Sequence, residues 1–321
     1  MRAALLYAKR DLRLVDINLP TISEKEILVR VRSCAVCPTD IRKYVTGNHS
    51  VKSYPINLGH EWSGDVVEAG SSVTGLKPGM RVVGSGFAGY ADYAMVPAER
   101  VERVFELPKG TTYEEATFVE PLADCIHAVV DRANIRDSDG VAVIGAGPMG
   151  LMLMMVAMIS GAKTVTTEPM RSRRRMACEL GADRVFDPGV DDALKPLEGK
   201  CDKVLVSIGH PKAIEQGLRL AKECGTVLLF GGATKGTTIQ LDPNLIHYRE
   251  IVLTGSYYVG IPPNPKLFQR ALSLISSGDV PVKKLITHRF SLEEIHRAFD
   301  VIEKKEGMKA IVFPDEQYLH E

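Results

Sequence analysis

Residues 1–121 alternate hydrophobic and polar positions with a period of two. In the stretch EILVRVRS, Ile27, Val29 and Val31 fall on one face of an extended chain, and two arginines fall on the other. The pattern returns in GDVVEAG, MRVVG and YADYAMVP, and glycine, proline and serine turns separate these stretches. This part of the chain is therefore predicted to be rich in β-strands.

The pattern changes near residue 120, where short apolar strands begin to alternate with helices. GVAVIGAG, KTVTTE and GTVLLFGG have the length and composition of buried strands, whereas the methionine-rich stretch after the first of them and PKAIEQGLRLAKE are helical. Such alternation predicts a parallel sheet with helices on both faces. The expected fold class is α/β, with a doubly wound domain beside the β-rich one.

Helix starts are marked twice by a Ser/Thr-x-x-Glu capping box. Thr112 to Glu115 opens one helix, and Ser291 to Glu294 precedes the amphipathic stretch IHRAFDVI, which Gly307 is expected to end. The stretch MKAIVFP then reads as a closing strand. This final helix and strand are expected to fold back onto the first domain.

The predicted domains are therefore a discontinuous one, 1–121 with 265–321, and a doubly wound one, 122–264. The 321 residues are 45% hydrophobic, and Lys+Arg and Asp+Glu both number 40, so no net charge attracts nucleic acid or an anionic membrane. The longest apolar stretch, GLMLMMVAMI, is too short to span a bilayer. Six cysteines without a secretion signal predict no disulfide framework, so a cytoplasmic location is expected.

A glycine-rich turn, VAVIGAGPMG, leads from a predicted strand directly into a predicted helix. Gly145, Gly147 and Gly150 form a G-x-G-x-x-G motif, with Pro148 and Met149 at the start of the helix. The glycines permit a tight turn and close approach of a pyrophosphate, and the helix N-terminus favours its negative charge. Both flanks of the motif are present, so these five residues are predicted to bind a dinucleotide.

Glu168 ends the next predicted strand, where it can accept hydrogen bonds from the adenine ribose. Its charge would repel a 2′-phosphate, which favours NAD over NADP. A run of arginines weakly favours NADP instead, although most of them are expected on a solvated helix face. The run consists of Arg171, Arg173, Arg174 and Arg175. NAD is the predicted cofactor, and Arg173 is included among the predicted cofactor-binding residues.

Metal-ligating residue types occur in the predicted β-rich domain. Cys37 as thiolate, His60 as imidazole and a carboxylate from Glu61 or Glu120 would give zinc three protein ligands and one open position. Cys37 begins a predicted helix, where a thiolate is favoured. Taken singly, each of these residues is more often structural than metal-binding. A four-cysteine structural zinc site is excluded, because Cys34–Cys37 is the only Cys-x-x-Cys pair in the sequence.

Four motifs together resemble the zinc-dependent medium-chain dehydrogenases, in particular the branch of sorbitol, threonine and butanediol dehydrogenases. The motifs are CPTD, GHEWSGDVVEAGSSV, VEPLADCIHA and GAGPMG, and the resemblance runs the whole chain. It implies a GroES-like catalytic domain and a Rossmann domain. It also implies that Cys37 and His60 bind zinc, that Glu61 and Glu120 bind zinc or its water, and that the Thr39 hydroxyl takes the proton of the substrate alcohol.

The resemblance further implies hydride transfer between NAD and a small secondary alcohol or polyol, by a homo-oligomer (dimer or tetramer). Two departures from the family pattern stand out. The lobe that carries four cysteines and a structural zinc is deleted, so one zinc per chain is expected. Arg42 replaces a histidine that ends the proton relay, and arginine cannot act as a base. Water, the cofactor ribose, His49 or His127 would then complete the proton exit.

Two other functions remain open at this stage. A zinc-independent quinone or enoyl reductase on the same fold would lack the ligand set around Cys37 and His60, which is present here. A noncatalytic dinucleotide-binding protein would keep the glycine-rich turn but would not need Thr39 or a full ligand set. Zinc content and reduction of the cofactor distinguish the three hypotheses.

Overall fold

The computed structural model describes residues 1–47, 51, 53–86, 88–190, 192–257 and 264–319. Its contacts divide the chain into two units: a discontinuous unit, Met1–Pro121 with Asn264–Glu321, and a central unit, Leu122–Pro263. These limits lie within one residue of the expected domain limits. The functions assigned to the two domains stay predictions. No helix in the described ranges is long and apolar enough to cross a bilayer.

The central unit contains a six-stranded sheet in which every neighbouring pair is parallel, in the order β11-β10-β9-β12-β13-β14. Its strands are β9 (Gly140–Ile144), β10 (Lys163–Thr167), β11 (Arg184–Phe186), β12 (Cys201–Val206), β13 (Ala221–Leu229) and β14 (Val252–Gly255). The chain runs outward from β9 to β11 and then returns to β12. The order therefore reverses between β9 and β12, where doubly wound folds bind their ligands.

Helices connect these strands, as the alternation in the sequence predicts. They are α3 (Val119–Ile126), which continues as the π-helix His127–Arg132, α4 (Pro148–Ile159), α5 (Arg171–Glu179), α6 (Pro211–Leu220) and α7 (Pro243–His247). Helix α4 packs on β9 and β10, and α6 packs on β12 and β13. The methionine-rich α4 is buried from Gly150 to Ala157, which explains its uniformly apolar sequence. The predicted α/β class with a parallel sheet is confirmed.

The discontinuous unit contains a larger sheet, in the order β15-β16-β3-β5-β6-β8 with β7 paired to β3, and a small sheet, β2-β1-β4. The strands are β1 (Arg2–Ala8), β2 (Asp11–Asp16), β3 (Ile27–Ala35), β4 (Ile56–Asn57), β5 (Glu61–Ala69), β6 (Arg81–Ser85), β7 (Tyr93–Val96), β8 (Phe105–Glu106), β15 (Ile286–Ser291) and β16 (Lys309–Phe313). The helices are α1 (Pro38–Thr46), α2 (Tyr113–Ala116), α8 (Pro265–Ser276) and α9 (Ile295–Glu303). Short 3₁₀ turns complete the unit.

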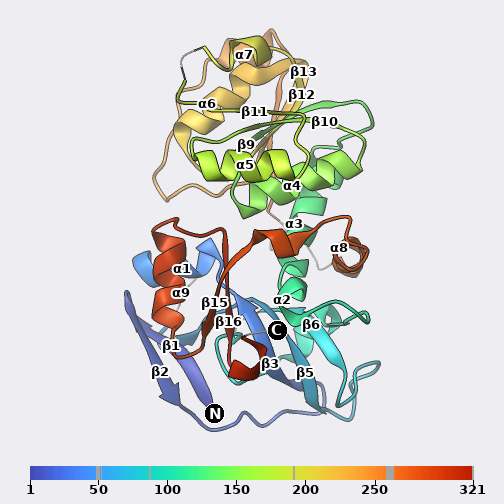
Figure 1. The fold of residues 1–321 in the computed structure, drawn as a ribbon, viewed down its shortest axis with the longest axis vertical. Helices are drawn as coiled ribbons and strands as arrows, with labels where there is room; N and C mark the ends of the chain where they lie inside the picture. The colour runs from blue at the N-terminus through green and yellow to red at the C-terminus, as the bar shows by residue number, and fades with distance from the viewer. Residues whose placement is uncertain (48–50, 52, 87, 191, 258–263, 320–321) are drawn as a thin grey trace. The chain divides into compact units, whose positions relative to one another are not determined.

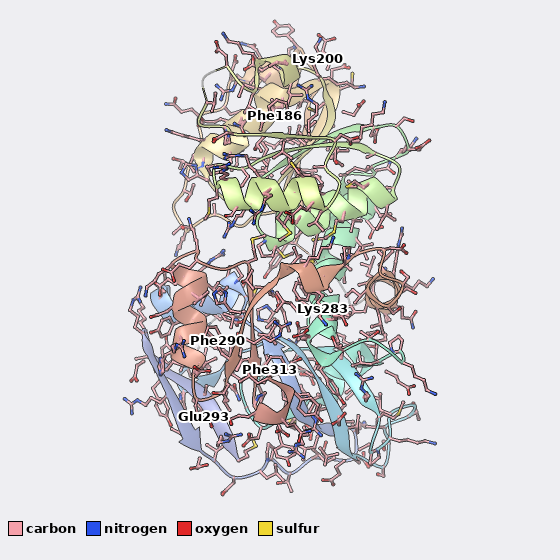
Figure 2. All side chains as sticks on the ribbon, in the orientation of Figure 1. Phe186, Lys200, Lys283, Phe290, Glu293 and Phe313 are labelled. Carbon is pink, nitrogen blue, oxygen red and sulfur yellow. The ribbon has the colours of Figure 1, made fainter. Side chains whose placement is uncertain are left out.

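Strand β3 is the centre of the discontinuous unit, because β5, β7 and β16 all pair with it. The closing strand β16 joins it through the pairs Ile311–Ala35 and Val312–Cys34. Phe290 and Phe313 lie on the neighbouring strands β15 and β16 (Figure 2). The end of the chain thus folds back onto the first domain, as expected.

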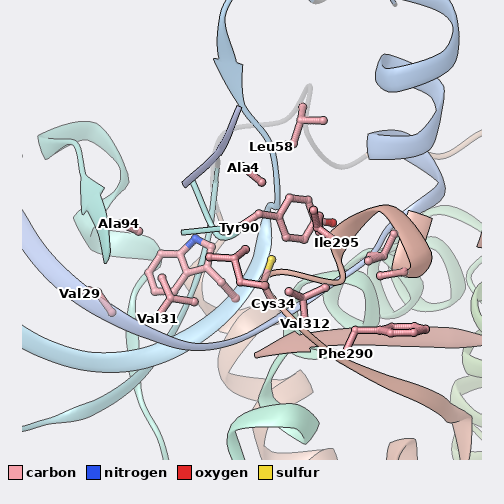
Figure 3. Packing of buried hydrophobic residues seen from close by; sticks show 14 of the residues in the cluster. Ala4, Val29, Val31, Cys34, Leu58, Tyr90, Ala94, Phe290, Ile295 and Val312 are labelled. Carbon is pink, nitrogen blue, oxygen red and sulfur yellow. The ribbon is translucent and has the colours of Figure 1, made fainter. Parts of the chain in front are cut away.

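A buried apolar cluster fills the space between the sheets and α9. The ring of Tyr90 lies close to Cys34 and Ile295 (Figure 3) and meets Phe299 edge-on, with ring centroids 5.6 Å apart. Trp62 packs against Gly84, where a Cβ atom would come within 2.4 Å of the indole. The apolar positions of the predicted final helix are therefore core positions.

The final helix differs from the prediction at both its start and its end. Helix α9 begins at Ile295, and the expected capping box forms only in part: the Ser291 N–H donates to Glu294 Oε2 at 3.2 Å, but the Ser291 side chain does not cap the helix. Lys305, with φ of 60°, takes the left-handed conformation in place of Gly307. A Cβ at Gly307 would come within 2.8 Å of His288, so this glycine permits close packing instead.

Candidate metal centre and nucleotide loop

Cys37 lies at the N-cap of α1, two residues after the end of β3. Its backbone is extended, with φ of −102° and ψ of 144°, and Pro38 at the first helical position has the φ that a helix requires. The Asp40 N–H closes the first turn by donating to the Cys37 carbonyl at 2.9 Å. The thiol is therefore held at a helix N-terminus, where negative charge is favoured.

His60 and Glu61 are brought to the same place by the turn that starts β5. Gly59 has φ of 84°, and a Cβ there would lie 2.8 Å from Cys34 Sγ, so only glycine fits. Glu61 is the first residue of β5 and pairs with Ala35, the last residue of β3. The glycine before the His-Glu pair is thus required by the close approach of β3.

One ligand atom each from Cys37, His60 and Glu61 lies within 4.8 Å of the others. Sulfur, nitrogen and carboxylate oxygen are the donors that zinc takes in proteins. Glu61 is 1% exposed, and its Oε1 has no hydrogen-bond partner within the described part of the chain. A buried carboxylate oxygen without a partner is costly unless a cation binds it. These residues therefore fit a zinc ion.

A buried carboxylate fixes the orientation of His60. Asp40, which is fully buried, places Oδ1 3.1 Å from His60 Nδ1, which leaves Nε2 for a metal. The Tyr90 hydroxyl lies 3.0 Å from Asp40 Oδ2, to which it donates, and 3.2 Å from the Ala35 carbonyl. Asp40 matches the acid of the family motif, whereas the role of Tyr90 is found only in the structure.

The charges of the centre are strongly coupled. Burial lowers the pKa of His60, but the charges of Asp40 and Cys37 outweigh it and hold that pKa well above its usual range. Burial and then the charge of Glu61 raise the pKa of the Cys37 thiol. Anionic groups thus crowd one another in a space with little water, and a divalent cation among them would offset their repulsion.

The remaining predicted site residues of this unit lie close by. Glu120, in the first turn of α3, is not in the group of three donors, and burial raises its pKa to about 7, with the charge of Glu61 adding to the effect and that of His60 opposing it. Thr39 is partly buried in the first turn of α1, and Arg42 on the same helix is exposed. The donor group in the structure therefore contains Glu61 and not Glu120, and which of the two carboxylates binds the metal stays a prediction.

The cation beside Glu61 could not be identified from the sequence. Lys309, the first residue of β16, forms an ion pair with Glu61 Oε2 and is 2% exposed. Lysine is almost never fully buried without a partner, and four apolar residues follow this one in a strand buried throughout. That pattern indicates burial of Lys309 but not its partner, because Glu61 lies far away in the sequence.

Each glycine of the nucleotide loop has its own steric reason in the central unit. Gly145 follows β9 with φ of 96°, and Gly147 is the N-cap of α4, with Pro148 and Met149 in its first turn. A Cβ at Gly150 would lie 1.9 Å from the Gly145 carbonyl oxygen. The loop therefore leaves the N-terminus of α4 open to an anion.

Glu168, which follows β10, is held against this loop. Its Oε2 accepts from the Ala146 N–H at 2.9 Å and its Oε1 from the Met170 N–H at 3.0 Å, and the residue is 5% exposed. The Arg173 guanidinium lies 3.8 Å from the position of a Cβ at Gly147, next to the start of α4. Glu168 and Arg173 thus both lie beside the loop.

The other arginines of the run have structural partners or lie in solvent. Arg174 donates to the Glu168 carbonyl at 2.8 Å and pairs with Asp187 at 2.8 Å, and Arg175 pairs with Glu179 at 3.4 Å while largely exposed. Of the two proposed relay histidines, His127 lies in the central unit with Nδ1 2.9 Å from Asp131 Oδ2. His49 lies outside the described residues.

The chain matches two family models, the alcohol dehydrogenase GroES-like domain at residues 23–109 and the zinc-binding dehydrogenase at residues 148–277. Among curated proteins, it is 30% identical to the sorbitol dehydrogenase of Bombyx mori over 347 aligned positions, with 97% of each chain covered. The chain therefore belongs to the zinc-dependent medium-chain alcohol dehydrogenase family. The family resemblance stated from the sequence is confirmed, and so are the GroES-like and Rossmann domains that it implied.

Solved structures agree with this assignment. A zinc-binding dehydrogenase of Sinorhizobium meliloti 1021, bound to NADP, superposes with a TM-score of 0.88 at 29% identity, covering 98% of this chain and 99% of that one. The 2R,3R-butanediol dehydrogenase of Bacillus subtilis has a TM-score of 0.87 at 27% identity, with the same coverage. The predicted functional class, a zinc-binding oxidoreductase that acts on alcohols, is confirmed.

Replacing Tyr90 with phenylalanine tests how the centre is oriented. Tyr90→Phe keeps the buried ring but removes the hydroxyl that donates to Asp40, so we expect the zinc dissociation constant to rise about tenfold. Competition with a chromophoric chelator measures this constant. Tyr93→Phe, in a neighbouring strand, is the control and should leave it unchanged. Equal affinities of the Tyr90→Phe variant and the original protein would show that the hydroxyl does not orient the ligands.

Proposed function

We propose that this protein transfers a hydride between a secondary alcohol or polyol and NAD, with one catalytic zinc per chain. The observation that carries the proposal is the meeting of Cys37, His60 and Glu61 within 4.8 Å. The substrate class rests on the printed activities of the relatives, which include sorbitol and butanediol dehydrogenases. Sorbitol and 2,3-butanediol share a secondary hydroxyl next to another hydroxyl.

The residues of the centre have different roles in the proposed reaction. When bound, zinc supplies a Lewis acid that acidifies an alcohol hydroxyl or polarises a carbonyl. Cys37, His60 and Glu61 hold the metal, and Asp40 keeps His60 in the binding orientation. The Thr39 hydroxyl accepts the proton of the substrate alcohol and passes it outward. Burial of these groups limits the access of water and strengthens every charge interaction among them.

The proton leaves Thr39 by a route that does not use Arg42. That arginine is exposed on α1, and a guanidinium group offers donors but no acceptor for a proton. His127 pairs with Asp131 in the central unit, which favours a structural role for it. The cofactor ribose and water are the groups that we propose for the exit.

NAD is the cofactor that Glu168 favours. The carboxylate is fixed at the loop by two backbone N–H groups, so it cannot easily move away from a 2′-phosphate. Arg173 is the cation best placed to bind a phosphate of the dinucleotide, beside the start of α4. Arg174, whose donors are used by backbone carbonyls and Asp187, contributes to the loop instead.

A single zinc per chain and a homo-oligomer complete the proposal. In the described ranges, Cys37, His60 and Glu61 form the one group of His, Cys, Asp or Glu ligand atoms close enough to hold a metal. Strand β14 is the edge of the parallel sheet, with Val252 54% exposed, and such an edge suits pairing with a second subunit in a dimer or tetramer. We keep the cytoplasm as the expected location.

Turnover with a panel of alcohols tests the proposal. Zinc-loaded protein incubated with NAD⁺ and polyols, cyclitols, diols or threonine should form reduced nicotinamide, measured by its absorbance, with at least one class. A chelator should abolish the turnover and added zinc should restore it, whereas His60→Ala should not respond to zinc. Chelator-resistant reduction of a quinone or enoyl substrate would instead favour a zinc-independent reductase, and protein without zinc or turnover would favour a noncatalytic role.

Removing the charge of Glu168 tests the cofactor assignment. Glu168→Gln keeps the size of the side chain but no longer repels a 2′-phosphate, so we expect the ratio of kcat/KM for NAD over that for NADP to fall about tenfold. Glu179→Gln, at the exposed end of α5, is the control. A wild-type preference for NADP, or a ratio that does not change in Glu168→Gln, would contradict the role given to this carboxylate.

A further inference from the structure

Lys309 is a buried cation in direct contact with a residue of the metal centre. Its ammonium group pairs with Oε2 of Glu61, and its nitrogen lies 5.6 Å from the centre of the Phe118 ring. The residue is 2% exposed and Glu61 is 1% exposed, so neither charge is solvated by water. A buried pair of this kind is costly to assemble and costly to break on one side only.

The two oxygens of Glu61 are in different surroundings. Both are buried and accept no hydrogen bond from the described residues, but the ion pair with Lys309 is formed by Oε2. A carboxylate can bind a metal through one oxygen or through both. With Oε2 held by an ammonium group, the oxygen left for a metal is Oε1.

The positive charge of Lys309 gives it a second role. The charges of Cys37, Glu61 and Glu120 all act on Lys309. A positive charge beside these groups offsets part of their repulsion, which lowers the cost of burying the cluster.

We propose that Lys309 is a positioning residue of the metal centre, which holds Oε2 of Glu61 so that this carboxylate offers a single oxygen to the metal. It also replaces part of the metal's charge when the metal is absent, and so competes with the metal for Glu61. This inference rests on the proposed zinc site and adds to it a residue from the far end of the chain.

Competition between Lys309 and the metal predicts a change in zinc affinity in the opposite direction to that expected for a purely structural lysine. In Lys309→Met, Glu61 loses its partner and keeps a buried, uncompensated charge until a metal binds. We therefore expect the metal-free variant to unfold at a lower temperature. Its zinc dissociation constant should fall about tenfold, because a positive charge that repels the metal has been removed. If Lys309 only supported the fold, its loss would weaken the zinc site together with the rest of the unit.

The experiment titrates zinc into metal-free full-length protein against a chromophoric chelator, with thermal unfolding followed in parallel. Lys283→Met is the matched control, since Lys283 lies 3.9 Å from the carboxylate of Glu114 but is largely exposed. Its zinc affinity should equal that of the original protein. Lys309→Gln replaces Lys309→Met if the latter does not fold, because its amide can still donate to Glu61 while the charge is lost.

Cobalt substitution and a double variant separate the outcomes. If Lys309 holds Oε2, Glu61 should add its second oxygen to the metal in the cobalt-loaded Lys309→Met protein, and the visible bands should weaken. In a double variant that combines Lys309→Met with Glu61→Gln, the effect of Lys309→Met on metal affinity should disappear. Unchanged or weaker zinc binding in a folded Lys309 variant would overturn the inference and leave the zinc site standing. An original protein that binds no zinc would instead overturn the proposed function.

Discussion

The register between β3 and β5 is the constraint on which the rest of the centre depends. Pairing of Ala35 with Glu61 places the residues that follow β3 beside those that precede β5, so Cys37 meets His60. A slip by one residue would turn Glu61 to the other face of the sheet and remove one ligand. The position of β3 is also fixed by β16 and β7, which pair with it at residues 34–35 and 27–30, and by its apolar side chains, which lie in the buried cluster.

Burial of charge is the second feature that shapes the centre. Asp40, Glu61 and Lys309 are all nearly inaccessible to water, and each has an ionisable partner within the same unit. Such groups add little to stability on balance, since their desolvation cancels most of their attraction. Their value lies in geometry: Asp40 fixes the ring of His60, and Lys309 fixes one oxygen of Glu61. The metal centre is thus prepared by partners from three different parts of the chain.

Much of this arrangement could be predicted from the sequence. The strands, the parallel sheet and the G-x-G-x-x-G loop follow from local patterns. Cys37 stands in one of the motifs that resemble the family, and His60 and Glu61 stand in another. Residues whose role depends on distant pairing could not be found this way. The hydroxyl of Tyr90 reaches Asp40 because of the core packing, and Lys309 reaches Glu61 because β16 lies beside β3. Gly307 was misread as a helix end, since its contact with His288 leaves no local trace.

X-ray absorption at the zinc edge tests the central claim, that Cys37, His60 and Glu61 form the metal centre. For protein loaded with one zinc per chain, the account predicts one sulfur ligand at about 2.3 Å and nitrogen or oxygen ligands at about 2.0–2.2 Å, with the sulfur lost in Cys37→Ser. A spectrum without sulfur, or one with several sulfur ligands, would contradict the account, because the described residues bring a single cysteine into the donor group.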